Sequence, residues 1–536
     1  KSIDIQQTQL EKLKELFPEA VSEGKVDWKK LKATLGEDIT FSNERYVLNW
    51  AGKSDAFNVL QTPTTSTLKP EKKESVNFDN TGHLFIEGEN LEVLKVLQKS
   101  YYGKVKMIYI DPPYNTGNEH FIYPDRFSES KEEYSKRVGE KDEAGYLTRE
   151  GMYRKNSKEN GHYHSNWLNM MYPRLFLARN LLKDDGVIFV SINDIEVHNL
   201  RLIMNEIFGE ENFITQLVWE KKKKGTFLSN SIANVKEYIL VYSKRIDKFN
   251  GLIGHINYET ETYPCINASN KRELRNIPAG IISKYRKPNY TLKKGNRISA
   301  STMDLILHSD LIIENNKLKQ DLIIEGNWRY TQKLMEEFAL KKELYITQDL
   351  YLRRIVKEPR QKTLKDLLPR VGENEDKSNK VVDVNNLFKG GWGSNEDGEE
   401  ELRLLMEEKA LMDFPKPRKL IEKLIASVRD KDAIILDFFA GSSTAAHAVL
   451  DLNKEDGGNR EFICVQLPEK TEESSEAYKT GYKNIAEIAK ERIRRVIKKI
   501  KNEQDAEEKE KAGKLDFDDK KEMPKLDLGF KVFKLQ

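Results

Sequence analysis

The sequence predicts an α/β protein built on a mostly parallel sheet, with one large insert in the chain. Two strand-like apolar runs, 105–110 and 187–190, stand on either side of a segment, 167–182, that has the apolar periodicity of a helix. Strands that alternate with helices are typical of parallel sheets with both faces covered. The alternation fades between residues 245 and 400, which are rich in Lys and Asn, and then resumes.

The other elements follow from the same patterns, short apolar runs for strands and helical spacing for helices. The expected strands are 84–86, 238–242, 433–439, 462–467 and a closing strand within 528–533, and the expected helices are 91–97, 197–208 and 420–428. We therefore predict an N-terminal extension (1–80), a first α/β half (81–244), the insert (245–400), a second α/β half (401–500) and a C-terminal segment (501–536). The highly charged run 502–514 is typical of a solvated helix face rather than of a binding site.

Composition excludes several classes of protein. The 536 residues favour two or three domains, and the 90 basic residues nearly balance the 87 acidic ones, so net charge alone does not indicate a nucleic-acid ligand. The two cysteines, Cys265 and Cys464, are too few for a disulfide scaffold or a cysteine-based zinc site and fit a reducing compartment. Without a bilayer-spanning apolar run or the apolar core of a signal peptide, we expect a soluble cytoplasmic protein with no membrane partner.

The tetrapeptide Asp111-Pro112-Pro113-Tyr114 directly follows the clearest strand of the chain. Two prolines cannot continue a central strand, because they lack the amide donors of the ladder. The chain therefore leaves the sheet at its carboxyl edge, where α/β proteins place their active sites. A strand-terminating turn is the plain alternative, but the whole tetrapeptide in this position favours a catalytic site.

The composition of the tetrapeptide suits the activation of a ring-bound amine, whose lone pair is delocalised. The Asp111 carboxylate and the Pro112 carbonyl oxygen can accept the two amine hydrogens and release the lone pair for attack on a methylsulfonium. Pro113 fixes that carbonyl, and Tyr114 offers a flat face for a base removed from a duplex. No metal is required for this chemistry.

A second strand ends in Asp437-Phe438-Phe439 and is followed by the small residues Ala440-Gly441-Ser442 and by Ser443-Thr444 at a helix start. Such a turn lets the backbone approach a ligand closely, although many α/β turns look similar. It lacks the lysine of a phosphate-binding loop, which argues against an ATPase. Glu469, after the strand 462–467, is placed either to bind ribose hydroxyls or simply to be solvated.

Together these segments resemble the modification (Mod) subunits of Type III restriction-modification systems, adenine-specific DNA methyltransferases of the permuted β class. The resemblance covers most of the chain and includes the segments 48–53, 85–95, 108–118, 414–417, 436–442 and 527–533. It implies a Rossmann-like methyltransferase sheet in permuted order, with the catalytic half at 81–244, the cofactor half at 401–500 and a target-recognition domain inserted at 245–400. It also implies a site-specific DNA adenine-N6 methyltransferase that uses S-adenosylmethionine.

Carried over residue by residue, the resemblance places Asp111 to Tyr114 around the target base. The cofactor-binding residues that it implies are Asn90, Pro415, Lys416, Pro417, Asp437, Phe438, Phe439, Ala440, Gly441, Ser442, Thr444 and Glu469. The family's loop usually has a second glycine where this chain has Ser443, and a threonine where it has Ala445. If the loop needs a positive φ at residue 443, serine strains it; otherwise the loop has adapted to serine.

DNA is the expected macromolecular partner. Lys221, Lys222, Lys223 and Lys224 form a basic run that is either a solvated loop or a set of phosphate contacts. The loop 115–165 is long and carries several aromatic and basic residues, but no roles are assigned within it. A Type III system implies a Mod homodimer and a separate helicase-nuclease subunit. This chain shows no helicase P-loop or nuclease motif, so any DNA cleavage would come from that partner. An orphan methyltransferase fits the sequence equally well.

Three other functions fit parts of the sequence. Cytosine-amine methyltransferases typically have Ser at the position of Asp111. Carbon-5 methylation needs a thiolate, and the only such Pro-Cys pair, Pro264-Cys265, lies in the irregular insert. The third alternative is a catalytically weak DNA-binding scaffold whose cofactor loop has decayed at Ser443.

Overall fold

The computed structural model of the 536-residue chain divides into two compact units. It describes residues 13–22, 25–35, 48–116, 163–222, 232–257, 260–300, 303–371, 387–388, 390–512 and 526–536. Unit 1 comprises residues 1–255 and 363–536, and unit 2 comprises residues 256–362. Each unit has its own hydrophobic core, so each is described by itself.

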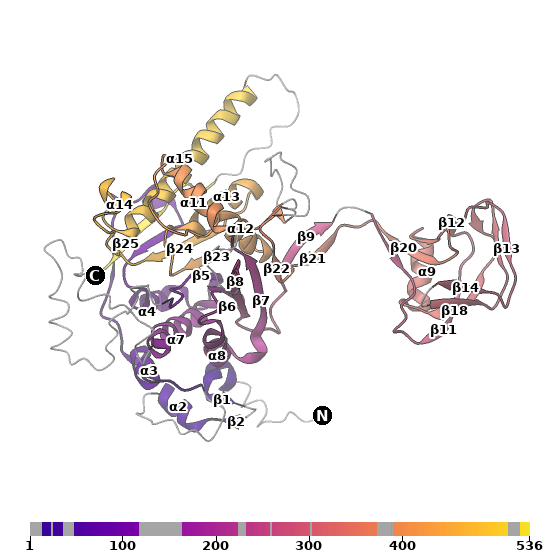
Figure 1. Ribbon diagram of the computed structural model, residues 1–536, viewed down its shortest axis with the longest axis horizontal. Helices are drawn as coiled ribbons and strands as arrows, with labels where there is room; N and C mark the ends of the chain where they lie inside the picture. Colours follow the sequence, from indigo (N-terminus) through magenta and orange to yellow (C-terminus); the bar gives the residue numbers. More distant parts are fainter. Residues whose placement is uncertain are drawn as a thin grey trace. The chain divides into compact units, whose positions relative to one another are not determined.

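Unit 1 is built on a ten-stranded sheet (Figure 1). From one edge to the other, its strands are β22 (Leu367–Leu368), β7 (Phe213–Glu220), β8 (Lys236–Ser243), β6 (Leu182–Ile192), β5 (Val105–Ile110), β23 (Ile434–Asp437), β24 (Glu461–Gln466), β4 (Leu84–Glu87), β25 (Lys531–Leu535) and β3 (Leu68–Pro70). The six strands from β6 to β25 are parallel, whereas β8 and β3 run antiparallel to their neighbours. The predicted α/β class with a mostly parallel sheet is confirmed.

Spatial order departs from chain order at the centre of the sheet. β23, from the second half of the sequence, lies between β5 and β24, and Met107 and Ile108 pair in parallel with Ile435 and Leu436. The halves on either side of the insert therefore share one sheet, as the permuted order predicted. The carboxyl ends of β5 and β23 consequently lie side by side.

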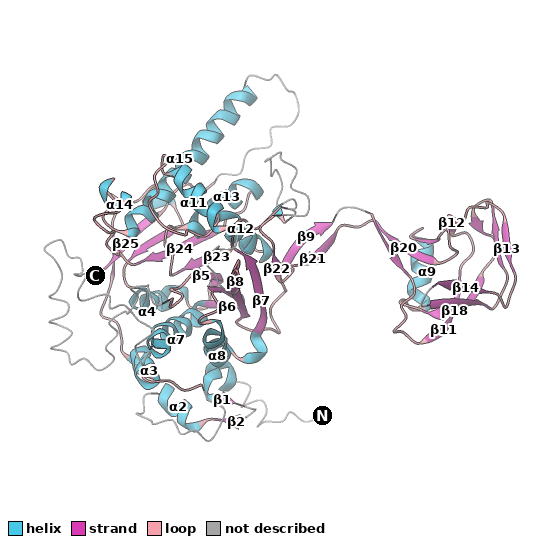
Figure 2. Cartoon of the chain, in the orientation of Figure 1, coloured by secondary structure: helices cyan, strands magenta, loops and turns pink. Residues whose placement is uncertain are grey.

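Helices cover both faces of this sheet (Figure 2). Side chains alternate along β5: Ile108 and Ile110 pack in the core with α4 (Asn90–Tyr101), α7 (Tyr163–Leu181) and α8 (Val197–Phe208). Met107 and Tyr109 pack in the opposite core with α12 (Arg418–Ser427), α13 (Thr444–Asp456) and α15 (Ile485–Ala512). This period of two explains why β5 is apolar throughout, since both of its faces are buried.

The remaining elements of unit 1 are short. They are η1 (Pro18–Ala20), β1 (Val21–Ser22), β2 (Lys25–Val26), α2 (Trp28–Thr34), α3 (Lys53–Gln61), η2 (Phe78–Asn80), η3 (Glu210–Asn212), α11 (Asn395–Leu405) and α14 (Glu476–Lys479). Among the described residues of both units, none of the helices combines the length and apolarity that a membrane crossing requires.

Unit 2 is mostly β structure around a small core that includes Leu305, Ile324 and Trp328. Its strands are β10 (Glu261–Pro264), β11 (Arg272–Ile277), β12 (Ile282–Ser283), β13 (Tyr290–Leu292), β14 (Arg297–Ala300), β15 (Met303–Leu307), β16 (Leu311–Glu314), β17 (Lys317–Leu318), β18 (Leu322–Asn327), β19 (Leu344–Ile346) and β20 (Leu352–Val356), with one helix, α9 (Gln332–Leu340). The chain passes between the units through β9 (Ile253–Asn257) and β21 (Arg360–Thr363), which pair with each other.

The compact insert is narrower than the predicted range 245–400. Leu367 and Leu368 pair with Val218 and Trp219 at the edge of the unit 1 sheet, and Trp392 packs in the unit 1 core. The described residues after 362 therefore belong to unit 1. Their weak periodicity comes from short, irregular segments that pack against a sheet edge.

Candidate active site

The predicted catalytic tetrapeptide and the predicted cofactor turn meet at one edge of the sheet. Asp111 follows β5, and the turn 438–443 follows β23, so the parallel pairing of the two strands places both at the same carboxyl edge. Three hundred residues of sequence separate them, and only the central position of β23 brings them together.

These segments line one cavity of about 460 Å³. The tetrapeptide forms part of its wall with Asn90, Phe438, Phe439, Gly441 and Glu469, and the segment 395–416 contributes Asn395, Met412, Phe414 and Lys416. The cavity therefore joins a carboxylate and a tyrosine to an aromatic, glycine-containing turn. All of its lining residues belong to unit 1.

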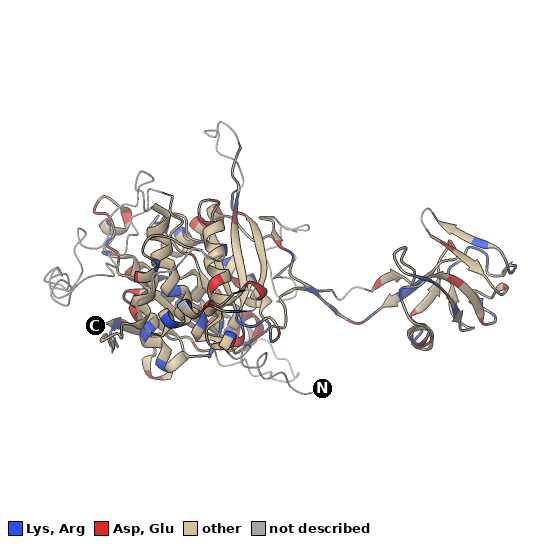
Figure 3. Ribbon diagram, turned by 90° about the horizontal axis from the view of Figure 1, so that it is seen from below, with Lys and Arg blue, Asp and Glu red and all other residues tan. Residues whose placement is uncertain are grey.

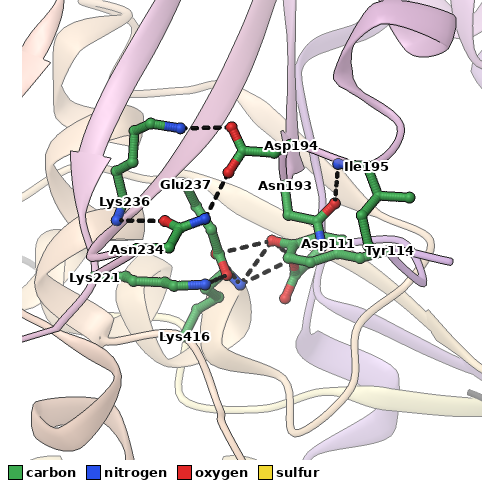
Figure 4. Close-up of polar contacts among 10 residues, drawn as sticks. All are labelled: Asp111, Tyr114, Asn193, Asp194, Ile195, Lys221, Asn234, Lys236, Glu237 and Lys416. Atoms are coloured by element: carbon green, nitrogen blue, oxygen red, sulfur yellow. Dashed lines mark hydrogen bonds and ion pairs between the residues drawn. The ribbon is translucent and has the colours of Figure 1, made fainter. Parts of the chain in front are cut away.

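A compact polar network holds Asp111 and Tyr114 in place (Figure 4). The Tyr114 hydroxyl donates to Asp111 Oδ1 at 2.8 Å and lies 3.1 Å from Glu237 Oε2. Lys416 Nζ lies 3.1 Å from Asp111 Oδ1 and 3.2 Å from Glu237 Oε2, and it donates to the Tyr114 hydroxyl at 2.9 Å. Lys221 Nζ donates to Glu237 Oε1 at 2.8 Å. Two carboxylates and two ammonium groups therefore balance in charge.

The network fixes the protonation states of Glu237, Lys416 and Tyr114. Burial acts to raise the pKa of Glu237, but the ammonium groups of Lys416 and Lys221 outweigh it and hold that pKa below its ordinary value. Burial acts to lower the pKa of Lys416, but the carboxylates of Asp111 and Glu237 outweigh it and hold that pKa above its ordinary value. Burial, with the same two carboxylates, raises the pKa of Tyr114 far above its ordinary value. Glu237 and Lys416 are therefore charged at neutral pH, and Tyr114 keeps its proton.

Asp437, at the end of β23, differs from these carboxylates. Burial raises its pKa to about 8, against an opposing hydrogen bond from the Phe439 amide, and the charge of Asp111 raises it further. Phe439 N donates to Asp437 Oδ1 at 3.1 Å. Asp437 does not line the cavity, so its contact with the Phe439 amide indicates that it shapes the turn from behind.

Asn90 joins the two sequence halves beside the cavity. Its side-chain amide donates to the Phe438 carbonyl at 2.9 Å, and its oxygen accepts from Arg174 Nε at 2.6 Å. The buried Arg174 also pairs with Glu89, the N-cap of α4, at 2.6 Å. The cofactor turn is therefore anchored to the catalytic half through Asn90.

Ser443 has φ 62° and ψ 42°, the left-handed conformation that favours glycine, at the N-cap of α13. Its hydroxyl is buried without a hydrogen-bond partner of ordinary geometry among the described residues, beside the Cys464 thiol. The turn therefore holds a left-handed conformation at a residue that is not glycine.

Half of the predicted cofactor residues line the cavity. Asn90, Lys416, Phe438, Phe439, Gly441 and Glu469 do so, whereas Pro415, Pro417, Asp437, Ala440, Ser442 and Thr444 lie behind it. The hydroxyls of Ser442 and Thr444 each accept from Arg492 at 2.8 Å, so these two residues brace the turn. The Lys416 ammonium lies at Asp111 rather than beside Phe439 and Gly441, because Glu237 and Asp111 offer it two carboxylates.

The predicted basic run is only partly described. Lys221 and Lys222 line the cavity, and Lys221 is paired with Glu237, whereas Lys223 and Lys224 lie outside the described residues. Most of the loop 115–165 also lies outside them.

Comparison with known proteins agrees with this geometry. The profile of the DNA methylase family matches residues 105–479. The chain belongs to this family. It is 34% identical to the Type III restriction-modification enzyme StyLTI Mod subunit of Salmonella typhimurium, over 87% of the chain and 64% of that relative. It is also 32% identical to the EcoPI Mod subunit of Escherichia phage P1 (92% of the chain, 74% of the relative) and 27% identical to the Type II methyltransferase M.KpnI of Klebsiella pneumoniae (79% and 89%).

The Pro264-Cys265 pair has no features of a nucleophile in this methylase. Cys265 is fully buried in the core of unit 2, and burial raises its pKa to about 12. A nucleophilic cysteine needs a lowered pKa and an accessible sulfur. The structure therefore gives no support to carbon-5 methylation through this residue.

Sequence reasoning missed Glu237. It stands near the start of an apolar strand, where a carboxylate is ordinarily solvated, and it is 126 residues away from Asp111 in the chain. The available signal was topological. Because β8 runs antiparallel to β6, the beginning of β8 lies at the carboxyl edge of the parallel strands.

Proposed function

We propose that this DNA methylase transfers a methyl group from S-adenosylmethionine to the exocyclic N6 amine of adenine in DNA. The observation that carries the proposal is a single cavity shared by the Asp111 carboxylate and the turn Phe439 to Gly441. Names of relatives add support, because Mod subunits are the modification components of Type III restriction-modification enzymes.

The cavity has the features that an adenosyl cofactor needs. Gly441, with φ 52°, leaves its backbone open to close approach, and Phe438 and Phe439 offer apolar faces. Glu469 supplies a carboxylate at the end of the strand next to β23, where ribose hydroxyls are bound in related α/β folds. S-adenosylmethionine supplies an electrophilic methyl group on a sulfonium.

The rest of the chemistry belongs to the protein. Asp111 and the Pro112 carbonyl accept the hydrogens of the target amine, which draws its nitrogen toward a tetrahedral geometry and makes the lone pair available. Tyr114 stacks on the flipped base, with its ring held by its hydroxyl contacts to Asp111 and Glu237. The Pro113 carbonyl accepts from Trp167 Nε1 at 2.7 Å, which fixes the tetrapeptide on α7. Preorganised acceptors and an aligned amine lower the barrier by roughly 7–11 kcal/mol.

Unit 2 is the proposed reader of the DNA sequence within the predicted target-recognition domain. In residues 256–362, Lys and Arg outnumber Asp and Glu, and Figure 3 colours both kinds of residue along the ribbon. An excess of cations favours contact with phosphates, and the strand-rich scaffold presents many loop side chains to base edges. Lys222, Lys223 and Lys224 are proposed phosphate contacts in unit 1, whereas Lys221 is paired with Glu237.

The wider setting that we propose is a Type III restriction-modification system in the cytoplasm. A Mod homodimer would recognise and methylate the site, and a separate helicase-nuclease subunit would cut unmodified DNA. An orphan methyltransferase without a restriction partner is the second candidate. The match to M.KpnI, a Type II methyltransferase of which the chain covers more than of the StyLTI Mod subunit, supports a methyltransferase that acts outside a Type III complex.

Methylation-sensitive sequencing of DNA from cells that express the protein tests the proposal. We expect N6-methyladenine at one short sequence, which is lost when Asp111 is replaced by Ala. Modified cytosine, or no modification while the protein still binds cofactor, would contradict the assigned reaction. Co-purification of a helicase-nuclease from the native host separates the Type III setting from the orphan one.

A further inference from the structure

The ammonium group of Lys416 is fully used in its buried site. A lysine carries three donor hydrogens, and Nζ of Lys416 has three acceptors within 3.2 Å: Asp111 Oδ1, Glu237 Oε2 and the Tyr114 hydroxyl. It also lies 5.0 Å from the centre of the Tyr114 ring. Such complete satisfaction is expected where burial of a charge would otherwise be costly.

The two oxygens of Asp111 have different surroundings. Oδ1 lies at Lys416 Nζ and accepts from the Tyr114 hydroxyl. Within the part of the chain that the structure describes, Oδ2 makes no hydrogen bond, and Asp111 borders the cavity. One oxygen is therefore saturated by the protein, and the other is available to a ligand.

We propose that Lys416 is a positioning residue for methyl transfer: it holds Oδ1 of Asp111, so that Oδ2 is the oxygen that accepts the hydrogen of the target amine. Glu237, itself held by Lys221, keeps the Lys416 ammonium in place. This inference rests on the proposed function, because it assigns Oδ2 to the amine that the function requires.

The backbone of Lys416 is fixed independently of this network. Pro415 and Pro417 flank it, and Gly398 packs so closely that a Cβ there would lie 2.2 Å from the Pro415 carbonyl oxygen. The Thr444 hydroxyl contacts the Lys416 carbonyl at 3.4 Å. The segment is thus held on the cofactor half, while its ammonium reaches Asp111 on the catalytic half.

The charges that face Asp111 make Lys416 its main electrostatic partner. Glu237 from β8 and Asp437 from β23 are carboxyl groups, and Tyr114 and Tyr109 are phenols with raised pKa values. Lys416 is the cation in direct contact with Asp111 among the described residues, and Lys221 acts through Glu237. Removal of Lys416 therefore takes away the cation that holds Oδ1 of Asp111.

The test is the steady-state kinetics of adenine methylation by the full chain on DNA that carries its mapped site. In Lys416→Met, we expect kcat to fall at least about tenfold, because small misplacement of a catalytic group is costly, while KM for S-adenosylmethionine stays within about threefold. Lys490→Met is the matched control. Lys490 is also buried and pairs with Glu74 and Glu87 away from the cavity, so this variant should lose stability and keep the wild-type kcat.

A second variant guards against misfolding. Lys416→Met with Glu237→Gln removes one charge of each sign and leaves no carboxylate buried alone. We expect its kcat to stay lowered at least about tenfold, since small misplacement of a catalytic group is costly. KM for S-adenosylmethionine should stay within about threefold.

Wild-type kcat in Lys416→Met or in the double variant would overturn the inference. Failure of the proposed function is distinguishable, because wild-type protein would then leave adenine in DNA unmodified in the same assay.

Discussion

Ser443→Gly tests whether the cofactor turn carries backbone strain. A non-glycine residue in the left-handed region costs about 1–2 kcal/mol, and Ser443 sits there with φ 62°. Its buried hydroxyl, which lacks a partner of ordinary geometry among the described residues, adds a further cost. Glycine itself lowers the free energy of unfolding by about 0.5–1 kcal/mol, because it gives the unfolded chain greater freedom. The balance favours glycine, by about 1 kcal/mol in the free energy of unfolding.

Urea unfolding of the two proteins measures this difference, and calorimetric titration of S-adenosylmethionine measures its effect on the turn. Ser442→Gly is the matched control: Ser442 has no positive φ and accepts from Arg492, so its replacement should destabilise. If Ser443→Gly were instead destabilised by about 0.5–1 kcal/mol, the turn would have adapted to serine and the strain argument would be wrong.

Three further predictions follow from the site and the insert. Asp111→Ala should lower kcat by at least about 10²–10³-fold and leave cofactor and DNA affinity within a few-fold of wild type, because it removes an acceptor used mainly in the transition state. Rapid-quench and titration assays measure the two effects, and turnover within tenfold of wild type would contradict the assignment. Exchange of residues 256–362 for those of a relative should change the methylated sequence with adenine still the target, which sequencing reads directly, and activity on the original site would refute the division of labour. For Asp437, the pKa of about 8 in the folded protein exceeds the ordinary 3.8, so the stability that its protonated form contributes is present below pH 4 and is lost as pH rises toward 8. The free energy of unfolding, measured at pH 5 and pH 8, should therefore show Asp437→Asn gaining on wild type at the higher pH. The same difference between the two proteins at both pH values would contradict the raised pKa.

The sequence predicted most of the fold of unit 1, because its strands and helices have unmistakable patterns. The helix 197–208 is observed as α8 with the same bounds, and the strand 105–110 as β5. The helix at 167–182 begins earlier, at Tyr163, since Pro173 within it and its apolar faces on two sides blur the periodicity. Local pattern also located the tetrapeptide, because a double proline must end a strand.

The contacts between distant segments could not be predicted from the sequence. Nothing in the local pattern of Lys416 or Glu237 shows that the two side chains meet at Asp111, because the meeting depends on β8 being antiparallel and on β23 entering the sheet beside β5. The short strand β22 was missed because two leucines, Leu367 and Leu368, carry no period. Family resemblance implied that the segment of Lys416 binds the cofactor, but the direction of its side chain is set by the nearest carboxylates.

The position of the insert explains how a permuted chain can keep a rigid site. The first half of the chain ends in β8, and the second half begins with β22. Both strands lie at the same side of the sheet, so the chain leaves the sheet for the insert and returns to it at that side. β9 and β21, through which the chain enters and leaves residues 256–362, pair with each other. The contacts that assemble the site, Asn90 to Phe438 and Lys416 to Asp111, lie within unit 1 and connect its two sequence halves. A change in the insert therefore need not disturb the amine acceptor, whereas a change that separates the halves would remove the cofactor turn and the positioning lysine together.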